Sequence, residues 1–415
     1  MSRTSQREDD ERYGWTIVAV LAVTETVSWG VLYYAFAVFL PPMQQALGWS
    51  KTELTGAFSL ALATSALAAI PVGRWLDRHS PRPLMTLASL AGAALIVAWS
   101  QVHDLALFYL TWIGIGLVMA CLLYEAAFTV VTKWFRERRR QALTAVTLVG
   151  GWASFVFSPL SNRLIDVLGW RHALVTLAII LAASTVPLHA FFLRPAPRRN
   201  ERGHTLVSGD PLAAAAEWQV STGAAVRSSA FWYLTAAFVL SSFAISAVAV
   251  HLIPYLLEGG RGAAFAAFAA GLMGLMQVPG RIVFAGAMHA LPQRYEAPAV
   301  FLLQGAGLAV LAATTSAPGV VAGVCLFGMG NGMATLVRAT AIAEAYGSAF
   351  YGSIAGVLAA CATGARAVAP VIAAGAYVAF SGYEPLFWLL AAGSVLAALT
   401  VREANQQLAG SHLEA

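Results

Sequence analysis

The sequence predicts an all-α membrane protein, with twelve transmembrane helices in two six-helix halves around a central cavity. Its composition, the spacing of its apolar segments and an internal repeat support this fold class. Of the 415 residues, 59% are hydrophobic and 11% charged, and the mean hydropathy is +0.70. A soluble globular domain has about 25% charged residues. Lipid is therefore the expected solvent for most of this surface.

The apolar segments divide the chain into twelve expected spans, since a transmembrane helix needs about 20 mostly apolar residues. They are 15–40, 53–73, 84–100, 105–131, 142–163, 172–193, 229–257, 263–288, 297–314, 318–343, 350–379 and 385–401. The longest polar stretch, 194–228, has the composition of a linker. The predicted parts are an N-terminal tail (1–14), a six-helix bundle (15–193), a central loop (194–228), a second bundle (229–401) and a C-terminal tail (402–415).

Landmarks recur in the same order in the two parts of the chain, at an offset of 213 or 214 residues. The matched pairs are Pro41 and Pro254, Gly73 and Gly286, Gly114 and Gly328, and Gly169 and Gly382. Large transporters often consist of two related halves. The repeat therefore indicates two copies of a six-helix unit.

Basic residues predict the orientation. With both termini in the cytoplasm, 18 of the 25 Lys and Arg residues lie in cytoplasmic segments, four on the opposite side and three within spans. This asymmetry follows the positive-inside rule. We expect a multi-pass protein of the cell inner (plasma) membrane with both termini cytoplasmic. Because the arginines lie in short runs between spans, the net charge of +5 does not indicate nucleic-acid binding.

The loop after the second span reads Gly73-Arg74-Trp75-Leu76-Asp77-Arg78-His79-Ser80-Pro81-Arg82. It resembles the signature of the major facilitator superfamily at Gly73, Asp77, Arg78 and Arg82, although Ser80 replaces the second glycine of that signature. The resemblance extends over essentially the whole chain and implies the fold and alternating-access transport of that superfamily. An Asp in such a loop can accept hydrogen bonds from a helix N-terminus or an Arg. We expect these four residues to form a conformational latch; the alternative is an anchor at the lipid headgroups.

Further segments resemble the oxalate/formate antiporter and monocarboxylate transporter branch of the superfamily. They are Trp29–Phe36, Leu47–Ser50, Gly169–Arg171, Gln277–Arg281 and Tyr351–Gly352. That branch holds substrate carboxylates with basic residues in spans eight and eleven. The resemblance thus implies a substrate-binding role for Arg281 and Arg366, which fall in those spans.

Ionisable groups inside spans are costly, so each is a functional candidate. The planar guanidinium of an Arg matches a carboxylate with two parallel hydrogen bonds. We therefore expect Arg281, Arg366 and Arg338 to bind an anionic substrate. The alternative is that each of them forms a structural ion pair with Glu25 or Glu125.

Tyrosines in the spans supply further polar groups. Tyr33, Tyr34 and Tyr124 are candidate substrate-binding residues. Adjacent residues of an α-helix do not face the same way, so we expect aromatic packing elsewhere for at least one of Tyr33 and Tyr34.

Glu25 and Glu125 are candidates for proton coupling. Burial favours the neutral form of a carboxyl group, so protonation can alternate as the cavity opens to each side. A neighbouring Arg opposes this effect, and a permanently ionised pair is the rival interpretation. His251 is a third candidate, although a hydrogen-bonded histidine within the helix bundle is the simpler interpretation.

These features predict a secondary active transporter for a small organic anion, a mono- or dicarboxylate, coupled to protons or to exchange. The alternatives are multidrug efflux by the same superfamily and a non-transporting membrane sensor. The sequence has no nucleophile elbow, metal-ligand spacing or phosphate loop, so we expect no enzymatic activity, cofactor or metal. The expected partners are the substrate, protons or a counter-substrate, and lipid; the protein is expected to be a monomer.

Overall fold

Helices form nearly all of the chain. The computed structural model describes residues 3–197, 219–286, 292–314 and 316–413. In chain order the elements are α1 (Arg3–Ser28), the π-helix η1 (Trp29–Tyr34), α2 (Ala35–Leu47), α3 (Lys51–Arg78), α4 (Pro81–Ser100), α5 (Leu105–Leu122), α6 (Tyr124–Trp134), α7 (Arg139–Gly150), α8 (Ala153–Phe192), α9 (Thr222–Arg227), α10 (Ser229–Glu258), α11 (Ala263–Leu275), α12 (Gln277–Gly286), the 3₁₀-helix η4 (Gln293–Tyr295), α13 (Glu296–Ala313), α14 (Ala317–Tyr346), α15 (Tyr351–Phe380) and α16 (Tyr383–Leu413). No strand occurs within these ranges.

The described helices cross the membrane twelve times. Eleven helical stretches are long and apolar enough to span a bilayer. The longest, Arg139–Phe192, contains Gly169 with φ 74° and ψ 159°, a conformation that ends one helix and begins the next. This break divides the stretch into the two spans predicted at 142–163 and 172–193. The predicted fold class is confirmed.

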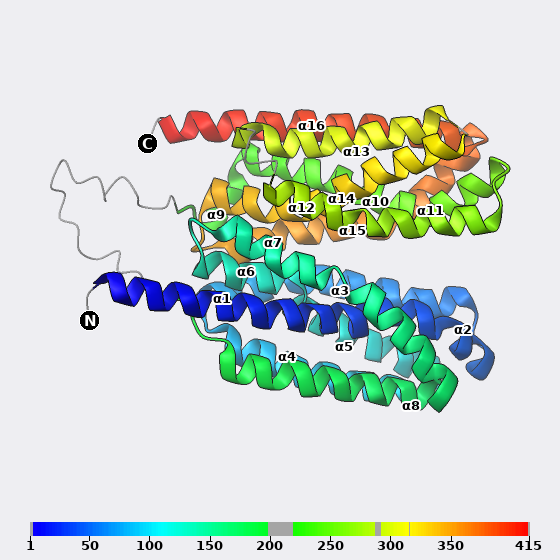
Figure 1. Cartoon of the computed structure of the whole chain (residues 1–415), viewed down its shortest axis with the longest axis horizontal. Helices are drawn as coiled ribbons and strands as arrows, with labels where there is room; N and C mark the ends of the chain where they lie inside the picture. Colours follow the sequence, from blue (N-terminus) through cyan, green and yellow to red (C-terminus); the bar gives the residue numbers. More distant parts are fainter. Residues whose placement is uncertain (1–2, 198–218, 287–291, 315, 414–415) are drawn as a thin grey trace.

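The two halves lie side by side. Figure 1 shows α1–α8 in the lower part of the molecule and α10–α16 in the upper part, with both chain ends on the left. We call the end of the bundle where the chain begins and ends the termini side. Helix α1 begins within the predicted N-terminal tail and α16 continues through most of the C-terminal one. The domain bounds stay predictions, since most of the central loop, 198–218, lies outside the described residues.

Local sequence explains several helix starts. Ser50 and Glu53 form a capping box at the start of α3, in which each side chain accepts a hydrogen bond from the other residue's backbone N–H. The Asp104 side chain accepts from the backbone N–H of Leu107 and begins α5. At α14, Ser316 accepts from the N–H of Gly319. These caps satisfy backbone donors that a helix start leaves without a partner.

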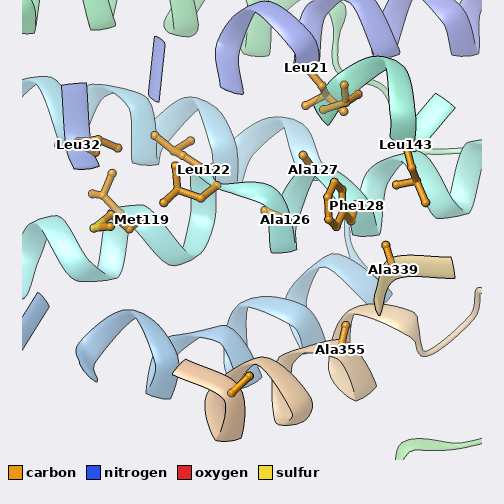
Figure 2. Packing of buried hydrophobic residues seen from close by; sticks show 14 of the residues in the cluster. Leu21, Leu32, Met119, Leu122, Ala126, Ala127, Phe128, Leu143, Ala339 and Ala355 are labelled. Atoms are coloured by element: carbon orange, nitrogen blue, oxygen red, sulfur yellow. The ribbon is translucent and has the colours of Figure 1, made fainter. Parts of the chain in front are cut away.

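Small residues bring the halves together at the termini side. A Cβ on Gly73 of α3 would lie 2.0 Å from the carbonyl oxygen of Gly352 in α15, so these two helices touch through their backbones. Figure 2 shows Ala127 and Phe128 of α6 facing Ala339 of α14 and Ala355 of α15 across the same seam. This packing closes the termini side of the bundle.

Candidate substrate-binding cavity

A cavity of about 420 Å³ lies between the halves. Its wall includes residues of η1, α3, α5, α6, α7 and α8 from the first half, and of α10, α11, α12, α14 and α15 from the second. This volume is within the range of small-molecule sites, roughly 300–1,000 Å³.

Irregular backbone is concentrated at this cavity. Leu123 has an extended backbone (φ −86°, ψ −178°) and separates α5 from α6 in mid-span. The first span contains the π-helix η1, and Leu123 and part of η1 both line the cavity. At membrane depth, non-helical backbone is tolerated where it lines a cavity or is covered by protein. π-helical turns are likewise frequent at functional sites.

An aromatic cluster forms part of the wall on the side of the first half. The ring centroids of Trp29 and Tyr33, and those of Trp29 and Tyr124, are 5.1 Å apart. Tyr33 and Tyr34 both line the cavity and contact each other edge to face at 5.2 Å. Regular α-helical geometry does not predict this arrangement. The π-helix accounts for it, because its wider turn changes the angle between successive side chains.

Three guanidinium groups line the cavity on the side of the second half. Arg281 of α12 is 5% exposed, and its Nη1 donates a hydrogen bond of 2.6 Å to the backbone oxygen of Thr147 in α7. Its Nε has no hydrogen-bond partner among the described residues. The Arg366 guanidinium of α15 has neither an ion pair nor a hydrogen bond within the described part of the chain. Both groups are thus available to a ligand.

Arg338 differs from the other two arginines. Its Nη2 donates to Oε1 of Glu125, and this ion pair joins α14 to α6 across the cavity. Among the described residues, the ion pair that the alternative expects is present for Arg338 only. The charged residues of the wall are Glu125, Arg281, Arg338 and Arg366. With Glu125 ionised, the wall has an excess of positive charge.

Glu25 lies behind the aromatic cluster, one turn before Trp29 on α1. It is 1% exposed, and neither carboxyl oxygen has a hydrogen-bond partner in the described ranges. An ionised carboxylate without a partner is costly inside a membrane protein. The proton-coupling role of Glu25 stays a prediction.

His251 connects helices within the second half. Its Nε2 lies 3.0 Å from the backbone oxygen of Pro370, and its Nδ1 lies 3.4 Å from the Tyr383 hydroxyl. A carbonyl oxygen can only accept, so Nε2 is the donor in the first contact. His251 is not part of the cavity wall. Its surroundings match the simpler interpretation, a hydrogen-bonded histidine, and its coupling role stays a prediction.

The Asp77 carboxylate joins the halves at the termini side. It accepts hydrogen bonds from the backbone N–H groups of Gly352 (2.9 Å) and Ser353 (2.7 Å), at the N-terminus of α15. The Lys133 ammonium lies 3.5 Å from the same carboxylate. A negative charge at this position satisfies two free N–H groups and interacts favourably with the helix dipole. This is the geometry that the sequence predicted for an Asp latch.

The remaining latch candidates divide into two groups. Gly73 is in backbone contact with the second half, as described above. Arg82 donates from Nε to the backbone oxygen of Leu193 at 2.8 Å, a contact within the first half. Arg78 is exposed at the end of α3. Gly73 and Asp77 thus touch the opposite half, and the latch role of all four residues stays a prediction.

Sequence reasoning missed a second connection at the termini side. Arg140, at the start of α7, donates two hydrogen bonds of 2.7 Å to the two carboxylate oxygens of Glu296 in α13. Glu344 of α14 lies 3.7 Å away, and the guanidinium stacks over the Phe284 ring at 5.1 Å. In the sequence, Arg140 ends the basic run 133–140, which predicts only the orientation. Glu296, an acid at the end of an apolar span on the termini side, is the clue in the sequence.

The Arg140–Glu296 pair is expected to stabilise the folded protein. Arg140→Gln and Glu296→Gln should each destabilise it by about 3 kcal/mol, since removing one partner leaves a buried charge unpaired. The double variant should recover part of this loss. Thermal unfolding of the purified protein measures the three Tm values. Arg138→Gln is the matched control, because its pair with Glu11 is exposed and contributes about 0.5 kcal/mol. Equal effects of Arg140→Gln and Arg138→Gln would refute this role.

Comparison with known proteins identifies the family. The sequence model described as Major Facilitator Superfamily matches residues 21–370. The chain belongs to the major facilitator superfamily. This match, together with relatives of the oxalate/formate and monocarboxylate branch, confirms the family resemblance predicted from the sequence.

Relatives in the superfamily include transporters of carboxylates. The chain is 27% identical to monocarboxylate transporter 11 of Mus musculus over 260 residues, 61% of this chain and 54% of that one. It is 24% identical to the oxalate:formate antiporter of Oxalobacter formigenes over 244 residues, 57% and 54% of the two chains. The chain thus spans about half the length of the curated relatives it matches.

Solved structures of the superfamily share the fold. The E. coli fucose:proton symporter FucP in its outward conformation matches with a TM-score of 0.74 at 18% identity, covering 93% of this chain and 98% of that one. The human organic anion transporter MFSD10 matches with a TM-score of 0.68 at 16% identity, covering 94% and 99%. At these identities the likeness shows the superfamily fold alone.

Proposed function

We propose that this superfamily member is a secondary active transporter that works by alternating access and carries a small organic anion, a mono- or dicarboxylate. One observation supports this substrate class above all: Arg281 and Arg366 line a cavity between the halves without a carboxylate partner among the described residues. A charged group at this depth is costly unless a counter-charge pairs with it. A substrate carboxylate supplies that counter-charge and accepts the donors of a guanidinium.

The relatives support the same substrate class. Two of them are named as a monocarboxylate transporter and an oxalate:formate antiporter. Efflux of amphipathic drugs, the alternative within the superfamily, uses the aromatic wall but leaves the two guanidinium groups without a role.

We further propose that the cavity opens away from the termini side. Asp77, Gly73 and Arg140 connect the halves at the termini side, where α3 and α15 touch. The positive-inside rule puts this side in the cytoplasm, so the cavity faces outward in this state. Release of these contacts would let the halves rock and open the cavity to the cytoplasm.

Counterflow in proteoliposomes tests the proposed function. Proteoliposomes filled with an unlabelled carboxylate should accumulate the same radiolabelled carboxylate above the level of protein-free liposomes. Sugars and cationic drugs should not accumulate. Transport of cationic drugs with no carboxylate transport would contradict the proposal and favour the efflux alternative.

Proton coupling is proposed at the Glu125–Arg338 pair. Protonation of Glu125 removes its negative charge and frees the Arg338 guanidinium for the substrate. Removal of this negative charge should therefore strengthen carboxylate binding. Glu125→Gln imitates the protonated form and should bind the carboxylate more tightly than the unmodified protein at the same pH.

Calorimetric titrations of binding at one pH measure this difference. Asp166→Asn, at an exposed position of α8, is the control and should keep the affinity of the unmodified protein. Glu25→Gln removes a carboxyl group that does not line the cavity and should also keep that affinity. A Glu125→Gln protein that binds no more tightly than the unmodified protein would contradict coupling at this pair.

A further inference from the structure

The cavity has two chemically different sides. Its aromatic residues all come from the first half: Trp29, Tyr33, Tyr34, Tyr124 and Phe155. Its three guanidinium groups all come from the second half. A ligand that spans the cavity therefore meets aromatic rings at one end and positive charge at the other.

Four of these aromatic residues, Trp29, Tyr33, Tyr34 and Tyr124, form a continuous surface. Trp29 contacts Tyr33, Tyr34 and Tyr124 at ring-centroid distances of 5.1, 6.1 and 5.1 Å. Tyr124 is in turn stacked on Phe128 at 5.1 Å, with an interplanar angle of 11°. The backbone breaks at η1 and Leu123 bring these rings together. Such a fixed surface favours a flat ring that packs edge to face or offset against it.

The tyrosines also approach the positive side of the cavity. A Cβ on Gly150 would lie 2.7 Å from the Tyr124 hydroxyl, and a Cβ on the next residue, Gly151, would lie 2.3 Å from Nη1 of Arg281. The aromatic surface is thus adjacent to the Arg281 guanidinium, and Arg366 lines the same cavity. One small molecule with a carboxylate at one end can contact both.

The size of the cavity argues against a very short acid. Liquid water occupies about 30 Å³ per molecule, and a two-carbon acid is only a few times larger. Such an acid would fill a small part of the 420 Å³ and leave the aromatic surface in contact with water. A cationic aromatic compound fits the rings but is repelled by the arginines.

We propose that the substrate is an arylcarboxylate, an aromatic acid of the benzoate or phenylacetate type. Its carboxylate binds Arg281 and Arg366, and its ring packs against Trp29 and Tyr33. This inference rests on the proposed function, transport of an organic anion, and assigns the class of anion.

Three acids of equal charge test the inference: acetate, cyclohexanecarboxylate and benzoate. Isothermal titration of the purified protein should give a dissociation constant for benzoate at least tenfold below that for acetate. Cyclohexanecarboxylate should bind between them, because it buries apolar surface but has no aromatic face. If acetate binds as tightly as benzoate, the inference is wrong and the proposed function stands. If none of these acids and no dicarboxylate binds, the proposed function fails and the inference with it.

Two substitutions separate the sides of the cavity. Trp29→Leu should lower the preference for benzoate over acetate at least fivefold. Arg281→Gln should instead lower the affinities for both acids by similar factors. Trp29→Phe keeps an aromatic ring and should retain most of the preference. If gel filtration shows that the Trp29→Leu protein does not fold, Trp29→Phe replaces it in the test. An undiminished preference in a folded Trp29→Leu protein, or the same loss of preference in Trp29→Phe and Trp29→Leu, would overturn the inference.

Discussion

Arg366→Gln is expected to abolish transport of the carboxylate substrate. The guanidinium has no ion pair or hydrogen bond within the described ranges, so the substitution removes a ligand contact without breaking an internal one. Loss of a charge-assisted contact of about 3 kcal/mol weakens binding about a hundredfold. Counterflow in proteoliposomes should fall to the level of protein-free liposomes at substrate concentrations near the original dissociation constant.

Arg281→Gln should have a comparable effect on transport, with one difference. Arg281 also donates to the Thr147 backbone oxygen and so joins the two halves. Its loss should therefore lower the Tm as well, whereas Arg366→Gln should leave the Tm nearly unchanged. Arg163→Gln, at an exposed position of α8, is the control for a general loss of positive charge. Normal counterflow in both cavity variants would contradict the anion site.

Gly73→Val is expected to open the termini side of the cavity. The added Cβ would lie 2.0 Å from the Gly352 carbonyl oxygen, and this neighbour is backbone and cannot rotate away. Helices α3 and α15 must then separate, and Asp77 loses its contact with the N-terminus of α15. Transport should fall at least tenfold, because the halves can no longer close on the termini side.

Cysteine accessibility measures this opening. A Thr335→Cys reporter on the cavity wall is placed in a protein whose three native cysteines are replaced by serine. Its reaction with a membrane-impermeant maleimide from the termini side should rise strongly in Gly73→Val. Gly375→Val on the same helix α15 is the matched control, since a Cβ there meets nothing within 4 Å. If the reporter cysteine reacts equally slowly in the Gly73→Val and Gly375→Val proteins, the close backbone contact does not seal the cavity.

The fold could be predicted because lipid imposes a simple rule on the sequence. Each span needs a long apolar run, and polar loops mark the turns. The fifth and sixth spans illustrate this: the polar residues before Gly169 separated them in the sequence, and the structure breaks the helix at Gly169. The Asp77 contact could be predicted because a carboxylate at the end of a span interacts favourably with a helix N-terminus. The sequence placed Asp77 in a loop, whereas α3 continues through it to Arg78.

The shape of the candidate site could not be predicted to the same degree. The π-helix at Trp29–Tyr34 and the extended Leu123 depend on tertiary packing. The single glycine of the π-helix, Gly30, does not predict such a turn, and no proline or glycine adjoins Leu123. These backbone breaks place both Tyr33 and Tyr34 in the cavity wall. The Arg140–Glu296 pair was missed because its partners are 156 residues apart, and nothing in the basic run distinguishes Arg140 from its neighbours.

Equilibrium binding of a carboxylate to the purified protein tests the central claim most directly. The acid that gives the strongest counterflow is titrated into the unmodified protein, Arg366→Gln and Arg163→Gln by calorimetry at one pH and ionic strength. The anion site predicts saturable binding that Arg163→Gln keeps and Arg366→Gln weakens about a hundredfold. Equal affinities in all three proteins would contradict the claim that the unpaired cavity arginines hold the substrate.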